Sequence, residues 1–216
     1  MEDGQTIVSP SSIHHLPSSP QIVGLTGGVG MGKSTAAKFL HERGAPVVDA
    51  DELARELVEP GQPALVEIQN VFGKNVFAAD GKLRRDELAK IVFADAGARK
   101  KLEELLHPKI RERWLAQIED WRKENCPLAV VVIPLLFETQ AESHFDKIIC
   151  VACSEKSQRE RLRARGWSDE QISQRRAAQM PVAEKTARAD FVIWTEGNLE
   201  NHAKQIEEIF ATDFHR

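Results

Sequence analysis

Short apolar runs alternate with amphipathic stretches along most of the chain, and these runs have the length of β-strands. They predict strands at residues 22–25, 46–48, 128–133, 147–151 and 191–194. The run at 128–133 is continuous and rich in valine, which is typical of a strand covered on both faces. Because helical patterning separates the runs, the sequence predicts an α/β fold: a five-stranded parallel sheet with helices on both faces.

Helical patterning covers residues 34–43, 154–165 and 198–210, and a capping box at residues 168–171 begins a further helix. The stretch 52–122 is helical almost throughout, with expected breaks at residues 60–61, 73, 80–81, 97 and 107–108. This stretch is too long for a simple crossover between two strands. We therefore expect an inserted helical subdomain.

A glycine-rich loop joins the first strand to the first helix, and it reads Gly27-Gly28-Val29-Gly30-Met31-Gly32-Lys33-Ser34. The spacing G-x-x-x-x-G-K-S, between a strand and a helix, predicts a phosphate-binding P-loop. Glycines let backbone N–H groups curl around a phosphate, and the helix N-terminus adds partial positive charge. Lys33 can reach the β- and γ-phosphates, and the Ser34 hydroxyl can hold Mg²⁺. The loop predicts binding of a nucleoside triphosphate but not the fate of its γ-phosphate.

Composition narrows the class of protein. The 216 residues are 42% hydrophobic and 29% charged, which is ordinary for a globular protein, and the length fits one domain with an insertion. The net charge of −4 argues against bulk nucleic-acid binding. No apolar run approaches the roughly 20 residues of a membrane span. Residues 1–20 are rich in Ser, Pro and His, have no secretory pattern, and are expected to be a flexible extension.

The chain has three cysteines, Cys126, Cys150 and Cys153. An odd number without a signal peptide predicts reduced thiols and a cytoplasmic location. The C-x-x-C spacing of Cys150 and Cys153 fits redox chemistry or half of a metal site. However, Cys150 lies in an apolar run and no second Cys/His pair has zinc spacing, so buried thiols are the favoured interpretation.

Three classes of P-loop protein compete. A regulatory GTPase would carry D-x-x-G and N/T-K-x-D motifs, and neither is present in the expected places. A motor or transport ATPase usually has a strand that ends in a carboxylate, whereas the strongest buried strand here runs into Pro-Leu-Leu-Phe-Glu at residues 134–138. The remaining class is a small-molecule kinase, which needs a base, a source of cations and an acceptor site.

Asp49 and Asp51 follow the second strand and are candidates for the base. Ligands of doubly wound sheets bind at the carboxyl ends of the strands, where these residues lie. Alternation along an extended segment would place both side chains on the same side. In the alternative interpretation, Asp51 begins a helix and serves as its N-cap.

The stretch 154–188 holds nine basic and five acidic residues, a local net charge of +4. Between the fourth and fifth strands of a P-loop protein, such a stretch is expected to be a lid over the phosphates. Arg161 and Arg165 share one helix face. A solvated helix face is the alternative interpretation. His107, before Pro108, is either a substrate contact or a hydrogen-bond donor at a helix end.

Several segments together resemble the dephospho-coenzyme A kinase family, over about residues 21–210. They are the P-loop with Thr26 and Thr35, Asp49-Ala-Asp51 with Leu53-Ala-Arg55, Val58-Glu-Pro-Gly61, Leu106-His-Pro108, Pro134-Leu-Leu-Phe-Glu138, Arg161 with Arg165, Ala178-Gln179, Ala189-Asp190-Phe-Val-Ile193 and Gly197-Asn198. The P-loop is generic, whereas the Asp-Ala-Asp, His-Pro and Pro-Leu-Leu-Phe-Glu segments in that order are much more specific. Met31 stands where the family often has Ser, and residues 1–20 have no counterpart.

The resemblance implies ATP-dependent phosphorylation of the ribose 3′-hydroxyl of dephospho-coenzyme A, with Mg²⁺ as cofactor. It implies catalytic roles for Asp51 as general base, Lys33 and Arg161. The implied ATP-binding residues are Gly28, Val29, Gly30, Met31, Gly32, Lys33, Ser34, Thr35, Arg161 and Arg165, with Ser34 also on the metal. The implied acceptor-binding residues are Asp49, Asp51, His107, Leu135 and Phe137.

The expected organisation is a nucleotide-binding core of residues 21–58, 126–153 and 189–212, a helical acceptor-binding subdomain at 59–125, and a helical lid at 154–188. The expected partners are ATP and dephospho-coenzyme A, without nucleic acid or membrane, and the chain is expected to be a monomer or a weak homo-oligomer. Two alternatives remain: another small-molecule or nucleoside monophosphate kinase, and a non-catalytic nucleotide sensor.

Overall fold

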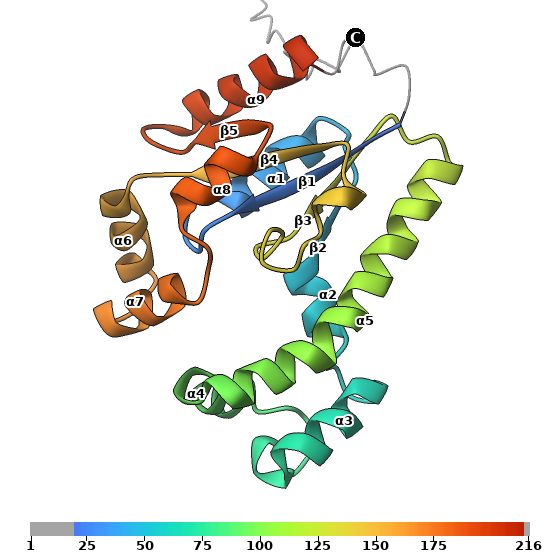
Figure 1. Cartoon of the computed structure of the whole chain (residues 1–216), viewed down its shortest axis with the longest axis vertical. Coiled ribbons are helices and arrows are strands. Elements are labelled where there is room, and N and C mark those ends of the chain that lie inside the picture. The colour runs from blue at the N-terminus through green and yellow to red at the C-terminus, as the bar shows by residue number, and fades with distance from the viewer. Residues whose placement is uncertain (1–19, 214–216) are drawn as a thin grey trace, which may run out of the picture.

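The computed structural model describes residues 20–213, so the predicted extension falls almost wholly outside the described residues. Five parallel strands form one sheet in the order β2-β3-β1-β4-β5 (Figure 1). Their bounds are β1 Gln21–Gly27, β2 Val47–Asp49, β3 Leu128–Val132, β4 Lys147–Ala152 and β5 Phe191–Trp194. The predicted five-stranded parallel sheet is confirmed, and each observed strand overlaps its predicted run.

The sheet separates two hydrophobic cores, because successive side chains of a strand point to opposite faces. Val23 and Leu25 of β1 join one core, and Ile22 joins the other. On the first face lie α1 (Lys33–Glu42) and α9 (Leu199–Asp213), whose buried residues include Leu40 and Ile206. All five residues of β3 are buried, as expected of a strand covered on both faces.

The second face is covered by the end of a long helix and by a loop. Helix α5 (Ala96–Lys123) packs Trp114, Ile118 and Trp121 against the sheet, and Leu136 and Phe137 follow β3 into the same core. Helix α8 (Val182–Arg188) contacts β1 and β4 on this side. Figure 1 shows α5 extending from the sheet to the helices at the bottom of the view. No helix in residues 20–213 is long and apolar enough to cross a bilayer.

The helical insertion has a hydrophobic core of its own. The insertion consists of α3 (Pro63–Phe72), α4 (Arg85–Ala94) and the first half of α5. The short helix α2 (Ala50–Glu56) precedes it and packs Ala50 and Leu53 in the second core of the sheet. The buried residues of the insertion core include Val58, Ile68 and Leu88. The predicted breaks at residues 60–61, 73 and 80–81 are confirmed, and a short antiparallel bridge between Phe77 and Leu83 surrounds the last of these breaks.

Two of the predicted helix breaks are wrong. Asp95, not Gly97, precedes α5, and its Oδ1 accepts a hydrogen bond of 2.7 Å from the Gly97 N–H. The helix then continues through His107 and Pro108, although proline lacks the donor for an internal helix bond. Figure 1 shows the two halves of α5 running in different directions. Packing on both sides of Pro108, against the insertion core and the sheet, keeps the helix continuous.

Two further helices stand at the edge of the sheet, α6 (Glu155–Ala164) and α7 (Asp169–Ala177). The predicted capping box at Ser168 is confirmed, since its hydroxyl accepts from Gln171 N–H and the Gln171 side chain accepts from Ser168 N–H. The Arg175 guanidinium of α7 lies 4.5 Å from the Phe93 ring of α4 and 4.2 Å from the Trp167 ring. This cation–π contact connects the insertion with the helices between β4 and β5.

A buried lysine fixes α8 to the segment that follows β3. The Lys185 side chain is 0% exposed, and its Nζ donates to the Pro134 carbonyl at 2.7 Å. It also forms an ion pair of 2.8 Å with Glu138 Oε1. A buried cation is stable only with such partners, so this contact holds α8 and residues 134–138 together.

We expect Lys185→Met to destabilise the protein by about 2–4 kcal/mol, because it leaves the Glu138 carboxylate without its cation. The matched control is Lys204→Met, which removes an exposed lysine 3.8 Å from Glu208 and should leave the unfolding midpoint nearly unchanged. Urea unfolding of both variants measures the difference. Equal midpoints for the two variants would contradict a structural role for Lys185.

Candidate active site

The phosphate loop connects β1, which ends at Gly27, to α1, which begins at Lys33. Gly27 has φ 142°, and a Cβ there would lie 2.2 Å from the Val151 carbonyl oxygen, so no other residue fits. Gly32 has φ 98° and precedes α1, and no side chain in the described part of the chain caps this helix start. The N-terminus of α1 therefore faces the loop with its partial positive charge and its N–H groups, as an anion site requires.

The Lys33 side chain folds back over the phosphate loop. Its Nζ donates to the Gly27 carbonyl at 2.8 Å and to the Gly28 carbonyl at 3.0 Å. Desolvation lowers the Lys33 pKa to about 8, and nearby Asp51 opposes this shift. The ammonium is thus a poorly hydrated cation close to an acidic side chain, which is an arrangement suited to an anionic ligand.

Asp49 and Asp51 meet at the carboxyl end of β2, but not as the alternation of an extended segment predicts. Helix α2 begins at Ala50, and Asp49 is its N-cap, with Oδ1 accepting from Asp51 N–H at 2.8 Å. The alternative interpretation of Asp51 as the N-cap is also wrong, since Asp51 lies in the first turn. A helical start competes successfully with extension here because the short Asp49 side chain satisfies an N–H of that turn.

The Asp51 carboxylate is accessible to solvent but has lost part of its hydration to the surrounding protein. This desolvation raises its pKa above the ordinary aspartate value, and the neighbouring charge of Asp49 raises it further. Lys33 and Arg55 act in the opposite direction. A carboxylate with a raised pKa beside the phosphate loop has the properties of a general base.

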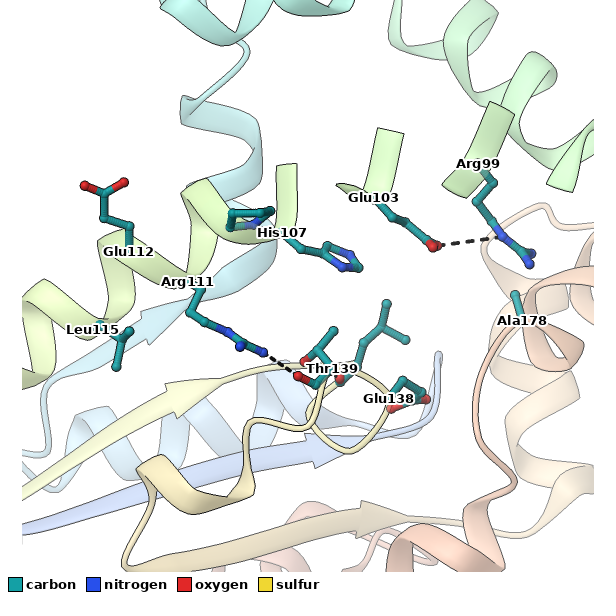
Figure 2. Close-up of a pocket in the computed structure, with 11 residues that line it drawn as sticks. Arg99, Glu103, His107, Arg111, Glu112, Leu115, Glu138, Thr139 and Ala178 are labelled. Atoms are coloured by element: carbon teal, nitrogen blue, oxygen red, sulfur yellow. Dashed lines mark hydrogen bonds and ion pairs between the residues drawn. The ribbon is translucent and has the colours of Figure 1, made fainter. Parts of the chain in front are cut away.

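A cavity of about 670 Å³ opens between α5 and the segment after β3 (Figure 2). His107 and Leu135 both line it, and burial lowers the His107 pKa. Because α5 is continuous, His107 is not at a helix end, and its role as a substrate contact stays a prediction. The lining residues are Arg99, Glu103, His107, Pro108, Arg111, Glu112, Leu115, Leu135, Glu138, Thr139 and Ala178.

Phe137 does not line this cavity. Its side chain is only 2% exposed, and its ring lies in the second core of the sheet, 4.6 Å from the Arg188 guanidinium. Arg111, which sequence reasoning did not single out, donates to the Thr139 carbonyl at the cavity wall (Figure 2). No motif marked Arg111, because its position on the inner face of α5 depends on the unpredicted continuity of that helix.

The two predicted lid arginines differ in their surroundings. Arg161 donates to the Thr195 hydroxyl at 2.7 Å and to the Thr195 carbonyl. The same hydroxyl donates to the Met31 carbonyl at 2.9 Å, so Arg161 reaches the phosphate loop through Thr195. Arg165, at the end of α6, is exposed to solvent. The structure therefore brings Arg161, but not Arg165, to the edge of the loop.

Two glutamines hold the tip of the loop. The Val29 N–H donates to Gln179 Oε1 at 3.0 Å, and Gln158 Nε2 donates to the Val29 carbonyl at 2.7 Å. Gln179 belongs to a segment that resembles the kinase family, but sequence reasoning gave it no role, and nothing marked Gln158. Hydrogen bonds between residues 150 and 129 positions apart leave no local pattern.

The cysteines contribute no second site. Burial raises the pKa of the Cys150 thiol to about 11, so Cys150 is a protonated, unreactive thiol. Cys126, Cys150 and Cys153 are all free. Within residues 20–213, no group of three or more His, Cys, Asp or Glu side chains could hold a metal ion.

The phosphate loop and the cavity wall share one backbone carbonyl. Thr26 Oγ1, just before the loop, donates to the Pro134 carbonyl at 3.3 Å, and Lys185 Nζ donates to the same oxygen. Lys185 is also close enough to Lys33 to lower its pKa. A phosphate loop, a carboxylate with a raised pKa and a cavity therefore lie at one edge of the sheet. This combination supports transfer of a phosphoryl group to an acceptor.

Comparison with known proteins identifies the family. The family model for dephospho-CoA kinase matches residues 21–201. The dephospho-CoA kinase of Anaeromyxobacter dehalogenans is 45% identical over 88% of this chain and 91% of its own length. The dephospho-CoA kinase of Geobacter sulfurreducens is 42% identical over 89% of this chain and 98% of its own length.

Solved structures agree with the sequence comparison. The crystal structure of TT1252 from Thermus thermophilus has a TM-score of 0.76 and 35% identity, and it covers 90% of this chain and 98% of that one. The dephospho-CoA kinase from Campylobacter jejuni has a TM-score of 0.67 and 28% identity over 89% and 96%. With a matching family model over most of its length and relatives above 40% identity, the chain belongs to the dephospho-CoA kinase family of phosphotransferases.

Proposed function

We propose that the protein transfers the γ-phosphate of ATP to the ribose 3′-hydroxyl of dephospho-CoA, with Asp51 as the general base. Membership of the family supports the two substrates. The observation that carries the assignment of roles is the place of Asp51 at the carboxyl end of β2, near enough to Lys33 of the phosphate loop to interact with its charge, with a pKa raised by desolvation. ADP and coenzyme A are the products.

The donor site consists of the loop from Gly28 to Thr35. Backbone N–H groups and the N-terminus of α1 surround the phosphates, and Lys33 exchanges its bonds with the Gly27 and Gly28 carbonyls for phosphate oxygens. Because Lys33 is already desolvated, its charge acts strongly on a developing negative charge. Arg161 of α6 completes the donor site, whereas a role for Arg165 would need a movement of the end of α6 toward the loop.

The acceptor site is the cavity between α5 and residues 134–139. His107 and Leu135 line it together with Arg99 and Arg111, whose guanidinium groups can donate to the diphosphate of dephospho-CoA although glutamates also line the cavity. Asp51 accepts the proton of the 3′-hydroxyl as its oxygen attacks the γ-phosphorus. The phosphorus–oxygen bond to the leaving ADP then breaks.

The residues beside Lys33 fit Mg²⁺. The exposed Ser34 hydroxyl and the Asp49 carboxylate offer oxygen atoms, the ligands this ion prefers. Since Mg²⁺ keeps several waters and binds substrate phosphates, one hydroxyl and one carboxylate acting through water suffice. When bound, the ion offsets charge on the β- and γ-phosphates.

The free thiols support a reducing compartment, and we propose the cytoplasm. A monomer or weak homo-oligomer, without nucleic acid, remains a prediction.

We expect ADP release from ATP with dephospho-CoA as acceptor but not with nucleoside monophosphates. A coupled ADP assay, followed by direct detection of coenzyme A, checks this expectation. Release with a nucleoside monophosphate instead would identify a different kinase, and binding of ATP without release for either acceptor would identify a nucleotide sensor.

Replacing the base tests the role of Asp51. We expect Asp51→Asn to lower kcat by about 10²–10⁴-fold, the usual contribution of a general base, with little change in ATP affinity. Glu52→Gln is the matched control, since it removes an exposed carboxylate from the same turn of α2. Single-turnover rates measure the effect on chemistry. A rate within a few-fold of the wild type would rule out Asp51 as an important base.

The pH profile provides a separate test. A general base must be ionised, so kcat/KM falls as the pH drops through the Asp51 pKa, which lies above the ordinary value of 3.8. Asp49→Asn keeps a capping oxygen for α2 but removes a charge that raises the Asp51 pKa. We therefore expect this variant to move the acid limb to lower pH. An acid limb that stays in place would contradict this electrostatic coupling.

A further inference from the structure

A single residue at the tip of the phosphate loop, Val29, has both its backbone N–H and its backbone carbonyl held by side chains from outside the core. Gln179 Oε1 accepts the Val29 N–H, and Gln158 Nε2 donates to the Val29 carbonyl. The amide orientations follow from chemistry, because an N–H can only donate and a carbonyl can only accept. The position of Val29 is therefore set by two residues that follow β4 in the sequence.

The contact between Gln158 and Val29 costs folding free energy, because it keeps a polar side chain buried. Gln158 is only 2% exposed, and its Oε1 finds no hydrogen-bond partner within residues 20–213. A buried acceptor without a partner destabilises the folded state. In an exposed loop, by contrast, water would satisfy the backbone N–H and carbonyl groups without this free-energy cost. The contact to Val29 is thus a built feature of the loop rather than an incidental one.

The Val29 contact does not block the phosphate site. Gln179 accepts from the N–H of Val29 only, and it takes none of the N–H groups at the N-terminus of α1, which begins at Lys33. Gln179 and a bound phosphate therefore need not compete, and the contact can persist during turnover.

The residues on either side of Gln179 reach the acceptor cavity. Ala178 lines the cavity, and the Met180 N–H donates to Glu138 Oε1 at 2.8 Å. Glu138 also lines the cavity and is fixed by the buried Lys185. Figure 2 shows Ala178 and Glu138 at the same end of the cavity. Of these three consecutive residues, Ala178 lines the cavity, Gln179 bonds to the phosphate loop and Met180 bonds to Glu138 in the cavity wall.

We propose that Gln179 is a positioning residue that couples the two substrate sites. Residues 178–180, here called the strap, connect the acceptor cavity to Val29, so that a ligand in the cavity orders the phosphate loop for ATP. The inference rests on the proposed placement of dephospho-CoA in this cavity. By thermodynamic linkage, ATP must strengthen the binding of dephospho-CoA by the same factor.

The test is the coupling between two ligands. Titration calorimetry on the full chain measures the Kd of an ATP analogue with a non-transferable γ-phosphate, with and without saturating dephospho-CoA. In the wild type we expect dephospho-CoA to tighten the analogue at least about fivefold, the lower end of common allosteric couplings. In Gln179→Met, which removes the acceptor atom, we expect the factor to fall to about one and kcat to drop more than the affinity for either ligand alone.

Three further variants make the outcome specific. Gln174→Met is the matched control, because this exposed glutamine of α7 contacts Glu170 and should leave the coupling unchanged. Gln158→Met releases the other side of Val29 and should weaken analogue binding while coupling persists. Gln179→Glu keeps an acceptor oxygen, so it should restore coupling even though its charge weakens analogue binding.

Coupling that is lost in Gln179→Met and kept in Gln179→Glu supports the inference. Equal coupling in the wild type and Gln179→Met overturns it, as does loss of coupling in both Gln179 variants. A wild type that binds both ligands and turns over without coupling also overturns it, while the proposed function stands. Failure of the wild type to bind dephospho-CoA at all would overturn the proposed function instead.

Discussion

The central position of β1 in a parallel sheet determines where every functional group of this protein lies. Its neighbours are β3 and β4, and all strands run in the same direction. The carboxyl ends of the strands therefore share one edge, and four of the five strands each lead to one part of the candidate site there. β1 leads into the phosphate loop, β2 into Asp49 and Asp51, β3 into the cavity wall, and β4 into the helix that carries Arg161.

The cations at this edge have a second feature in common, because each donates a hydrogen bond to a backbone carbonyl. Lys33 bonds to the Gly27 and Gly28 carbonyls, Lys185 to Pro134, Arg161 to Thr195 and Arg111 to Thr139. Carbonyl oxygens stabilise these positive charges without neutralising them. Among them, Lys185 also has a full ion pair, with Glu138, which suits a structural role, whereas Lys33 remains available for phosphate oxygens.

Local signals made the sheet and the phosphate loop predictable from the sequence. A strand buried on both faces requires an apolar run, as at β3, and the turn at Gly27 and Gly32 requires glycine. The path of α5 through Pro108 was not predictable, because tertiary packing on both sides outweighs the local preference of proline. The contacts of Val29 with Gln158 and Gln179 depend on long-range folding and have no local signal.

The central claim is that Asp51 joins a donor site to an acceptor site across one edge of the sheet. A crystal structure of the chain with the non-transferable ATP analogue and dephospho-CoA tests it most directly. We expect the ribose 3′-oxygen within about 3.2 Å of an Asp51 carboxylate oxygen, with the rest of the acceptor in the cavity beside His107 and Leu135. A 3′-oxygen that faces another side chain, or an acceptor bound outside the cavity, would contradict the claim.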